Sequence, residues 1–466
     1  MQSGHTGLVT LVDAHDPQSL SHDFSLGLGT PPVGCGPVIR PDDGCGCDGV
    51  PAARAQPRLL AVTDVRTPRS SLRERDGPAG PPGTRGSHAS DLSDIEKGTS
   101  MPIGSSTVLN AGPFDGVDPD DYVRAAMQWH FTPETGSRYW LERVDRLGFD
   151  PRHDVKGVAD LALFPDLTDE LRDVRVSDLV PRGYGPQARP LHVFESGGTT
   201  GAPKRVVQMD DWARHGGEQV SRRLRDHGLP VGALWLTVAP TGPHLVGDVL
   251  RRAAAGLGSP GLGVDMDPRW VKKLVAAGRR DEADAYTDHL VDQCRSILIG
   301  QDIGVIAATT PMLERFARDS ELVEVINGKA QAIIWGGTHM DPDTRDLLRT
   351  EVFPDVPVIG MYGNTMMLTA LVERVGLAAS EPCVFDPVSP YVFLSVVDPG
   401  TGQPVAEGER GQVVVSHVSR SMLIPHNRER DTAVRVRPAG GHAGDAVADV
   451  APVPAVEGGT VIEGVY

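Results

Sequence analysis

Short apolar runs alternate with helical stretches from Met101 onward. Each run has the length of a strand and consists largely of Val, Ile, Ala and Leu, which is typical of strands buried on both faces. The pattern predicts strands at 233–238 (ALWLTV), 304–308 (GVIAA), 332–335 (AIIW) and 356–360 (VPVIG).

Helix signals lie between these runs. Thr310-Pro311 and Asp341-Pro342 each combine a capping residue with a proline at the first helical position, and the helix expected over 210–227 ends at Gly228. Strands that alternate with helices indicate an α/β fold in which a mostly parallel sheet is covered by helices on both faces.

The last part of the chain changes character. Residues 391–397 (YVFLSVV) and 411–418 (GQVVVSHV) are rich in strand-forming residues, and a turn at 398–402 separates them. This predicts a small β-subdomain at about 385–435. Residues 436–466, which are rich in Gly, Ala and Val, are expected to form an irregular end.

Residues 1–100 differ in composition from the rest of the chain. They hold 14 Gly and 11 Pro but a single aromatic residue, Phe24. So few large side chains cannot bury enough apolar surface to offset the entropy of ordering, so we expect a disordered extension. Codons for Glu96-Lys97-Gly98 give a purine run like a bacterial ribosome-binding site, so Met101 is the expected start.

Charge and composition exclude several classes of protein. The net charge of −17 argues against nucleic acid as a partner. There is no run of about 18 apolar residues, so no membrane span is predicted, and no signal peptide is recognisable. Five Cys in 466 residues fit a reducing, cytoplasmic compartment. The pair Cys45 and Cys47 lacks further ligands at suitable spacing, so no metal site is predicted from cysteines. The sequence leaves the oligomeric state open.

The strongest chemical signal is the segment 194–204, FESGGTTGAPK. Glycines let backbone N–H groups approach an anion, threonines add hydroxyl donors, and Lys204 adds a positive charge. The spacing differs from that of the P-loop. The pattern therefore predicts a loop that binds a polyphosphate, formed by Ser196, Gly197, Gly198, Thr199, Thr200, Gly201 and Lys204.

This loop resembles the phosphate-binding signature of the adenylate-forming superfamily, which includes acyl-CoA synthetases and adenylation domains. Further segments follow in the order of that family. They resemble its YGxTE motif (361–366), its GExGE stretch (408–413) and its R-T-[GR]-D motif (428–431). Residues 139–149 and 161–171 resemble phenylacetate-CoA ligases. In size and truncation, the chain is similar to the adenylating proteins of phenazine antibiotic biosynthesis.

The resemblance covers about 120–435 and implies an AMP-binding adenylation domain over 101–435. The implied fold is the large N-terminal domain of the superfamily, without the mobile C-terminal domain. The implied reaction activates a small aryl carboxylic acid with ATP and Mg²⁺, giving acyl-AMP and pyrophosphate, before transfer to an amine, hydroxyl or thiol. An acceptor enzyme or a carrier is then an expected partner.

The resemblance also implies roles for single residues. Thr199, Thr200 and Lys204 would hold the β- and γ-phosphates, and Thr365 would meet the α-phosphate. Asp431 would accept hydrogen bonds from the ribose hydroxyls, and His244 would act at the carboxylate pocket. The implied adenine site consists of Gly336, Gly337, Thr338, Tyr362 and Gly363.

Two departures from the family pattern keep a second interpretation open. Met366 stands where the family has the glutamate that helps hold Mg²⁺, and a thioether is a poor ligand for a hard cation. The lysine of the C-terminal domain, which promotes adenylation in the family, has no counterpart after Asp431. The alternative to an adenylating enzyme is therefore a nucleotide- or ligand-binding protein of the same fold with little or no catalysis.

Overall fold

The computed structural model describes residues 108–196 and 202–453. The extension predicted over 1–100, with the expected start at Met101, lies outside the described residues. So do Gly197, Gly198, Thr199, Thr200 and Gly201 of the predicted phosphate loop.

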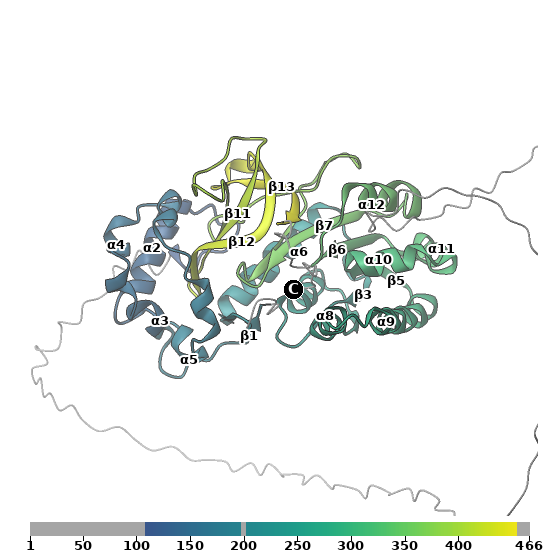
Figure 1. Ribbon diagram of the computed structural model, residues 1–466, viewed down its shortest axis with the longest axis horizontal. Helices are drawn as coiled ribbons and strands as arrows, with labels where there is room; N and C mark the ends of the chain where they lie inside the picture. Colours follow the sequence, from purple (N-terminus) through teal and green to yellow (C-terminus); the bar gives the residue numbers. More distant parts are fainter. Residues whose placement is uncertain (1–107, 197–201, 454–466) are drawn as a thin grey trace, which may run out of the picture. The chain divides into compact units, whose positions relative to one another are not determined.

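A six-stranded sheet forms the centre of the α/β part (Figure 1). Its order is β4-β3-β5-β6-β7-β8; neighbouring strands are parallel except for β8, which runs antiparallel to β7. The strands are β3 (Leu234–Val238), β4 (Gly261–Val264), β5 (Ile303–Ala308), β6 (Ala332–Gly336), β7 (Val358–Asn364) and β8 (Thr369–Val372). Every residue of β5 is buried, which explains its uninterrupted apolar sequence.

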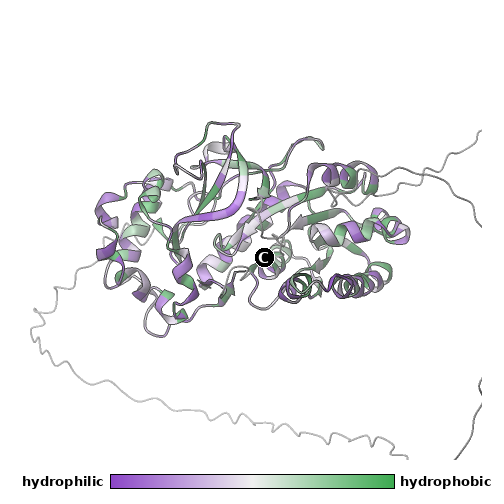
Figure 2. Cartoon of the chain, in the orientation of Figure 1, coloured by the Kyte–Doolittle hydropathy of each residue, from purple (hydrophilic) through white to green (hydrophobic). Residues whose placement is uncertain are grey.

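Helices pack against this sheet in two groups. α6 and α7 contact each other and β8, whereas α9 contacts β3 and β4 and packs beside α8, α10 and α11. In Figure 2 the helices contain both hydrophilic and hydrophobic residues, as expected for amphipathic helices over a sheet. Their bounds are α6 (Asp210–Asp226), α7 (Leu245–Gly256), α8 (Pro268–Ala276), α9 (Arg280–Gly300), α10 (Thr310–Ala317), α11 (Ser320–Lys329) and α12 (Pro342–Leu347), which a π-helical turn (Leu348–Val352) follows.

The predicted α/β architecture with a parallel sheet is confirmed. The four strands predicted from apolar runs correspond to β3, β5, β6 and β7, although β7 begins two residues later than predicted and extends to Asn364. The helix expected over 210–227 is α6.

A second sheet of five antiparallel strands has the order β10-β11-β12-β13-β9. The strands are β9 (Val384–Phe385), β10 (Val392–Val397), β11 (Arg410–Val418), β12 (Leu423–Val436) and β13 (Ala446–Pro452). The expectation of an irregular end after 435 was therefore wrong for 446–452, and the β-subdomain is longer than 385–435. β13 pairs with β12 on one side and β9 on the other, and it buries Ala446, Val447 and Ala448. The sequence of these small side chains shows little hydrophobic periodicity, so the strand is defined by its pairing with the neighbouring strands.

Short helices precede the first strand and pack against the second sheet. α2 begins at Pro119, where the Asp118 carboxylate caps it by accepting from the N–H groups of Asp120 and Asp121. Trp129 donates to the carbonyl of Arg420 at 2.9 Å. The α-helices are α2 (Pro119–Phe131), α3 (Arg138–Leu141), α4 (Pro151–Asp154) and α5 (Val176–Leu179); the 3₁₀ turns are Val144–Arg146, Val158–Leu163, Thr168–Arg172, Arg182–Tyr184 and, after β12, Ala439–Gly441.

A two-stranded hairpin, β1 (His192–Glu195) and β2 (Arg205–Gln208), holds the two ends of the predicted phosphate loop. Glu195 and Arg205 face each other in register and form an ion pair at 2.9 Å. Among the helices of the described ranges, none is both long and apolar enough to cross a membrane.

Candidate functional site

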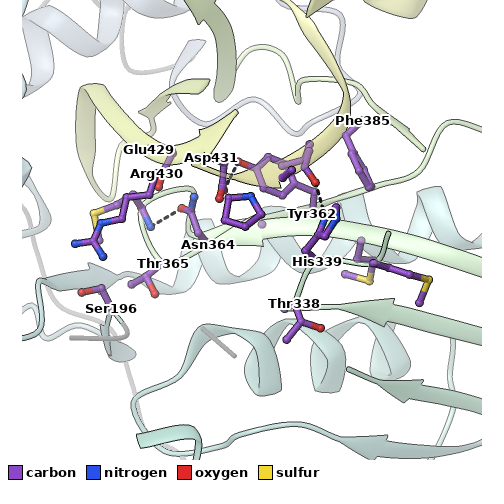
Figure 3. Close-up of a pocket in the computed structure, with 18 of the residues that line it drawn as sticks. Ser196, Thr338, His339, Tyr362, Asn364, Thr365, Phe385, Glu429, Arg430 and Asp431 are labelled. Atoms are coloured by element: carbon purple, nitrogen blue, oxygen red, sulfur yellow. Dashed lines mark hydrogen bonds between the residues drawn. The ribbon is translucent and has the colours of Figure 1, made fainter. Parts of the chain in front are cut away.

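A cavity of about 200 Å³ lies between the two sheets (Figure 3). One end holds Ser196, Lys204 and Arg172, and the other end holds residues that follow β6 and residues of β9 and β13. Its walls are formed by Trp335, Gly337, Thr338, His339, Met340, Arg345, Met361–Met366, Cys383, Phe385, Asn427–Asp431 and Asp449–Pro452.

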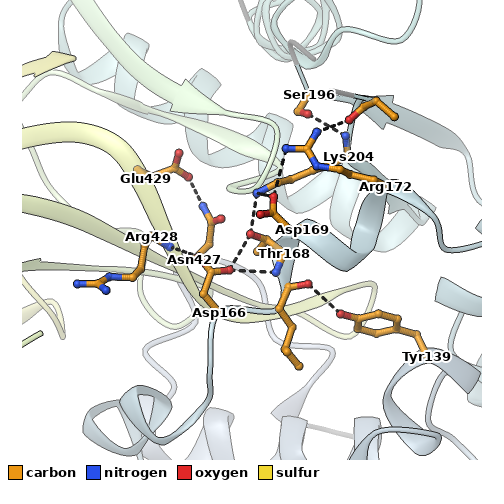
Figure 4. Close-up of polar contacts among 12 residues, drawn as sticks. Tyr139, Asp166, Thr168, Asp169, Arg172, Ser196, Lys204, Asn427, Arg428 and Glu429 are labelled. Carbon is orange, nitrogen blue, oxygen red and sulfur yellow. Dashed lines mark hydrogen bonds and ion pairs between the residues drawn. The ribbon is translucent and has the colours of Figure 1, made fainter. Parts of the chain in front are cut away.

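Lys204 lies at the end of the cavity where the sequence predicts polyphosphate binding, and Figure 4 shows its polar contacts. The N–H of Lys204 donates to Ser196 Oγ at 2.9 Å, and the N–H of Ser196 donates to the Lys204 carbonyl at 2.9 Å. This reciprocal pair closes the base of the loop. The structure therefore brings together the described ends of the segment that the sequence predicted, and the loop residues between them lie outside the described ranges.

The Lys204 ammonium binds protein oxygens on the 3₁₀ turn Thr168–Arg172. Nζ donates to Thr168 Oγ1 at 2.7 Å and pairs with Asp169 at 3.2 Å. Its hydrogen bond, followed by its charge, lowers the pKa of the Asp169 carboxyl. The Asp169 side chain is 82% exposed, so this ion pair is open to solvent and a phosphate can take the place of the carboxylate.

Tyr362 and Asp431 form the middle of the cavity. The Tyr362 hydroxyl donates to Asp431 Oδ2 at 3.0 Å, which links β7 to β12. Phe385 packs beside the Tyr362 ring with 5.7 Å between the ring centroids. An aromatic face and a carboxylate are thus placed next to each other, as a nucleoside requires for its base and its diol.

The predicted glycines owe their identity to close backbone packing. A Cβ on Gly336 would lie 2.7 Å from the Met361 carbonyl oxygen, and one on Gly363 would lie 2.6 Å from that of Thr369. Gly337 adopts φ +78°, which favours glycine. Thr338 Oγ1 accepts from the N–H of Thr310 at 3.1 Å and lines the cavity.

Asn364 and Thr365 turn the chain after β7. Asn364 Oδ1 accepts from the N–H groups of Met366 (2.9 Å) and Met367 (3.0 Å). Thr365 is buried and its hydroxyl lies 3.5 Å from the Glu195 carbonyl, close to the β1 end of the phosphate loop. Met366 is 5% exposed and lines the same cavity.

Glu429 is a cavity residue that sequence reasoning did not select. Its carboxylate accepts from Asn427 Nδ2, and burial, followed by the charge of Asp431, raises its pKa to about 8. A signal was present in the sequence, because Glu429 occupies the threonine position of the R-T-[GR]-D pattern. Its importance depends on burial, which the sequence does not show.

A smaller cavity of about 40 Å³ adjoins the first and shares Trp335, Gly337, Met361 and 363–365 with it. It lies at the carboxyl ends of β3, β5, β6 and β7, where strand order reverses between β3 and β5. Aliphatic side chains of α7 close it, namely Leu245, Val246, Val249 and Leu250. No charged residue lines it among those described, so it suits an uncharged group.

His244 lies at the N-terminus of α7 and lines neither cavity. Its side chain is buried, and Nδ1 has no hydrogen-bond partner among the described residues. Burial, followed by the positive charge of Arg269, lowers its pKa, which favours the neutral ring. His244 thus lies at the start of α7, the helix that closes the smaller cavity, but it does not join the other predicted site residues. Its role stays a prediction.

Comparison with known proteins supports a fold and not a family. No family model matches the chain, and no curated protein does. Two similar solved structures are of 2-hydroxyisobutyryl-CoA ligase. One, in the postadenylation state with R3-HIB-AMP, shows 14% identity and a TM-score of 0.50 over 68% of this chain and 62% of that chain. The other, an open conformation with 2-HIB-AMP and CoA, shows 16% identity and a TM-score of 0.50 over 68% and 64%.

The chain therefore spans less than two thirds of the length of these ligases. At such identities the likeness concerns architecture. The described part of this protein has the fold of the large N-terminal domain of adenylate-forming enzymes.

Proposed function

We propose that this protein activates a carboxylic acid with ATP, forming an acyl-adenylate and releasing pyrophosphate. One observation carries the proposal: a single cavity holds Lys204 at one end and the Tyr362–Asp431 pair in its middle, in the order that a bound nucleotide requires. The two structures of 2-hydroxyisobutyryl-CoA ligase, which contain acyl-AMP ligands, support it through the shared fold.

In the proposed mechanism the residues mainly position and stabilise charge. Lys204 leaves Asp169 and donates to the β- and γ-phosphates together with the loop 196–201. Asp431 accepts from the ribose, and Tyr362 lies against the base. A carboxylate oxygen of the acid attacks the α-phosphorus, the bond to the β-phosphate oxygen breaks, and pyrophosphate leaves. Thr365 donates to the α-phosphate as charge develops.

Mg²⁺ fits the described residues only with the help of the nucleotide. They contain no cluster of three His, Cys, Asp or Glu side chains that could hold a metal ion. Asn364 and Glu429 nevertheless place an amide and a carboxyl group in the cavity wall, and Glu429 would lose its proton on binding the ion. Mg²⁺ commonly binds to one or two protein oxygens together with phosphates and water. When bound, the ion would neutralise phosphate charge. Asn364 and Glu429 are the residues that would hold the ion, because the thioether of Met366 is a poor ligand for it.

The resemblance to phenylacetate-CoA ligases favours an aryl acid, and the resemblance to truncated phenazine-type proteins favours bacterial secondary metabolism. The acyl part would enter the smaller cavity. Its volume is about 40 Å³, whereas a cavity that binds benzene measures about 150 Å³. A short acid therefore fits the cavity as it stands, and an aryl acid requires the side chains of α7 to move.

The experiment is acid-dependent release of pyrophosphate from ATP, measured with a panel of short aliphatic and aryl acids. Wild type should release pyrophosphate with at least one acid, and Lys204→Ala should release less. ATP binding without pyrophosphate release for any acid would favour the second candidate, a nucleotide-binding protein. The buried thioether of Met366 at the polyphosphate side is the observation that keeps this candidate open.

A further inference from the structure

Arg345 is a buried cation without a hydrogen-bond or ion-pair partner among the described residues. It lies on α12, is 5% exposed and lines the larger cavity. Its Nε is buried and has no acceptor, and within 108–196 and 202–453 its guanidinium makes no hydrogen bond or ion pair. A buried charge is stabilised by acceptors around it, so a ligand in this cavity that offers acceptor atoms would bind favourably to Arg345.

Neighbouring groups do not neutralise Arg345. The nearby carboxylate of Glu373 pairs with Arg349 at 2.7 Å and accepts from the N–H of Gly360 at 2.8 Å. Burial raises the pKa of the Cys383 thiol to about 12, so that group carries no charge near neutral pH. The positive charge of Arg345 is therefore available to a ligand in the cavity.

Trp335 supplies a second donor in the same wall. Its indole Nε1 is buried without an acceptor among the described residues, and the side chain is 7% exposed. Trp335 comes from β6 and Arg345 from α12; both residues line the cavity, and each has a buried nitrogen without an acceptor among the described residues. Two such donors are matched by a ligand edge with two acceptor atoms.

The position of this region follows from the order of the other groups, and here the inference rests on the proposed function. Figure 3 shows Ser196 and Thr365 toward one side, Tyr362 and Asp431 in the middle, and Thr338 and His339 toward the other. α12 begins at Pro342, directly after the segment 337–340. With phosphates at Lys204 and ribose at Asp431, we expect the base to lie on the side of Thr338 and His339, the segment that α12 and Arg345 follow in the chain.

The bases differ in what they present to donors. Adenine places its N6 amino group, itself a donor, beside the acceptor N7, whereas a 6-oxopurine presents the acceptors O6 and N7 together, which a guanidinium binds with two hydrogen bonds. We propose that Arg345, aided by Trp335, reads the acceptor edge of the base, so that inosine and guanine nucleotides bind this protein at least as tightly as ATP.

The test measures binding of ATP, ITP, GTP and inorganic tripolyphosphate by calorimetry. Wild type should bind ITP at least as tightly as ATP. Arg345→Met should weaken ITP binding by roughly tenfold or more, the scale of a hydrogen bond to a charged group, and weaken ATP binding less. Tripolyphosphate, which has no base, should bind unchanged. Lys204→Ala is the matched control at the other end of the cavity, because it should weaken the binding of all four ligands.

Several outcomes would overturn the inference. A wild-type preference for ATP over ITP of about tenfold would do so while leaving ATP-dependent activation intact. If Arg345→Met weakened tripolyphosphate binding as much as ITP binding, Arg345 would contact the phosphates and not the base. Failure of wild type to bind any nucleotide would overturn both proposals. Ligand-free Arg345→Met should melt at or above the wild-type temperature, because it loses a buried unpaired charge; if it unfolds, Trp335→Phe must lower the ITP-to-ATP affinity ratio or the inference fails.

Discussion

The hydroxyl of Tyr362 donates a hydrogen bond of 3.0 Å to Oδ2 of Asp431, although 69 residues separate the two in the chain. The bond connects the last parallel strand of one sheet to the central strand of the other. It fixes the distance between an aromatic face and a carboxylate before any ligand arrives, and such preorganisation lowers the entropy lost on binding. Substitutions elsewhere in the cavity wall can therefore be tested while this pair stays in place.

Lys204→Ala should weaken ATP binding by roughly 1.5–3 kcal/mol, because it removes a charge-assisted hydrogen bond to phosphate. Calorimetry measures the change directly. Folding should be little affected, since the partner Asp169 is exposed and becomes hydrated. An unchanged affinity would mean that the segment 196–204 does not bind the phosphates.

Asp169→Asn should strengthen ATP binding, because the carboxylate competes with phosphate for the Lys204 ammonium. The gain should be less than about 1 kcal/mol, since the pair is exposed and solvent screens it. It should shrink as salt is added. Asp173→Asn is the control, because Asp173 is an exposed carboxylate of the same segment that forms no ion pair with Lys204. Equal gains in both variants would indicate a general charge effect.

Met366→Glu should lower the Mg²⁺ concentration required for half-maximal pyrophosphate release, because it returns a hard oxygen ligand to the cavity wall. Met366 is 5% exposed, so we expect Met366→Glu to lower the free energy of unfolding by about 1–3 kcal/mol. Met366→Gln has a similar shape without the charge. A Glu variant that needs as much Mg²⁺ as the Gln variant would refute the prediction.

The buried His417 should make the protein sensitive to acid. Burial lowers its pKa from 6.5 to about 3, while Nδ1 and Nε2 bind the Met367 carbonyl and Ser419 Oγ. A group whose folded-state pKa is depressed contributes stability that is present above 6.5 and is lost as the pH falls towards 3. The loss approaches roughly 1.4 kcal/mol per pH unit in this interval. Urea unfolding of wild type and His417→Gln should show a shallower pH dependence in the variant; parallel curves would contradict this assignment.

A protein that begins at Met101 should melt at the same temperature as the full chain. The reason is the single aromatic residue in 1–100, which gives that segment little apolar surface to bury. Calorimetric melting of both proteins measures this. A markedly lower melting temperature of the shorter protein would show that the segment contributes to the fold.

The sequence predicted the parallel sheet well because β5 and β6 are buried on both faces and therefore read as continuous apolar runs. β13 was missed because Ala446-Val447-Ala448 lacks such a run and is defined by pairing with β12. In the site, Lys204, Tyr362 and Asp431 belong to recognisable motifs. Glu429 lies in the motif at 428–431, but its raised pKa depends on burial, which the sequence does not show. Arg345 belongs to no motif; an arginine on a helix is usually exposed, and only the structure shows that this one is buried at the cavity.

The place of β13 has a consequence for the order of events during synthesis. This strand supplies 449–452 of the cavity wall and leaves the ribosome after every other described strand of both sheets. Since chains emerge from their N-terminus, the parallel sheet can form while its ligand pocket still lacks a side. Competence to bind a nucleotide is therefore acquired only after β13 has emerged, and a nascent chain stalled before Ala446 should be folded over β3–β8 yet unable to retain the ligand.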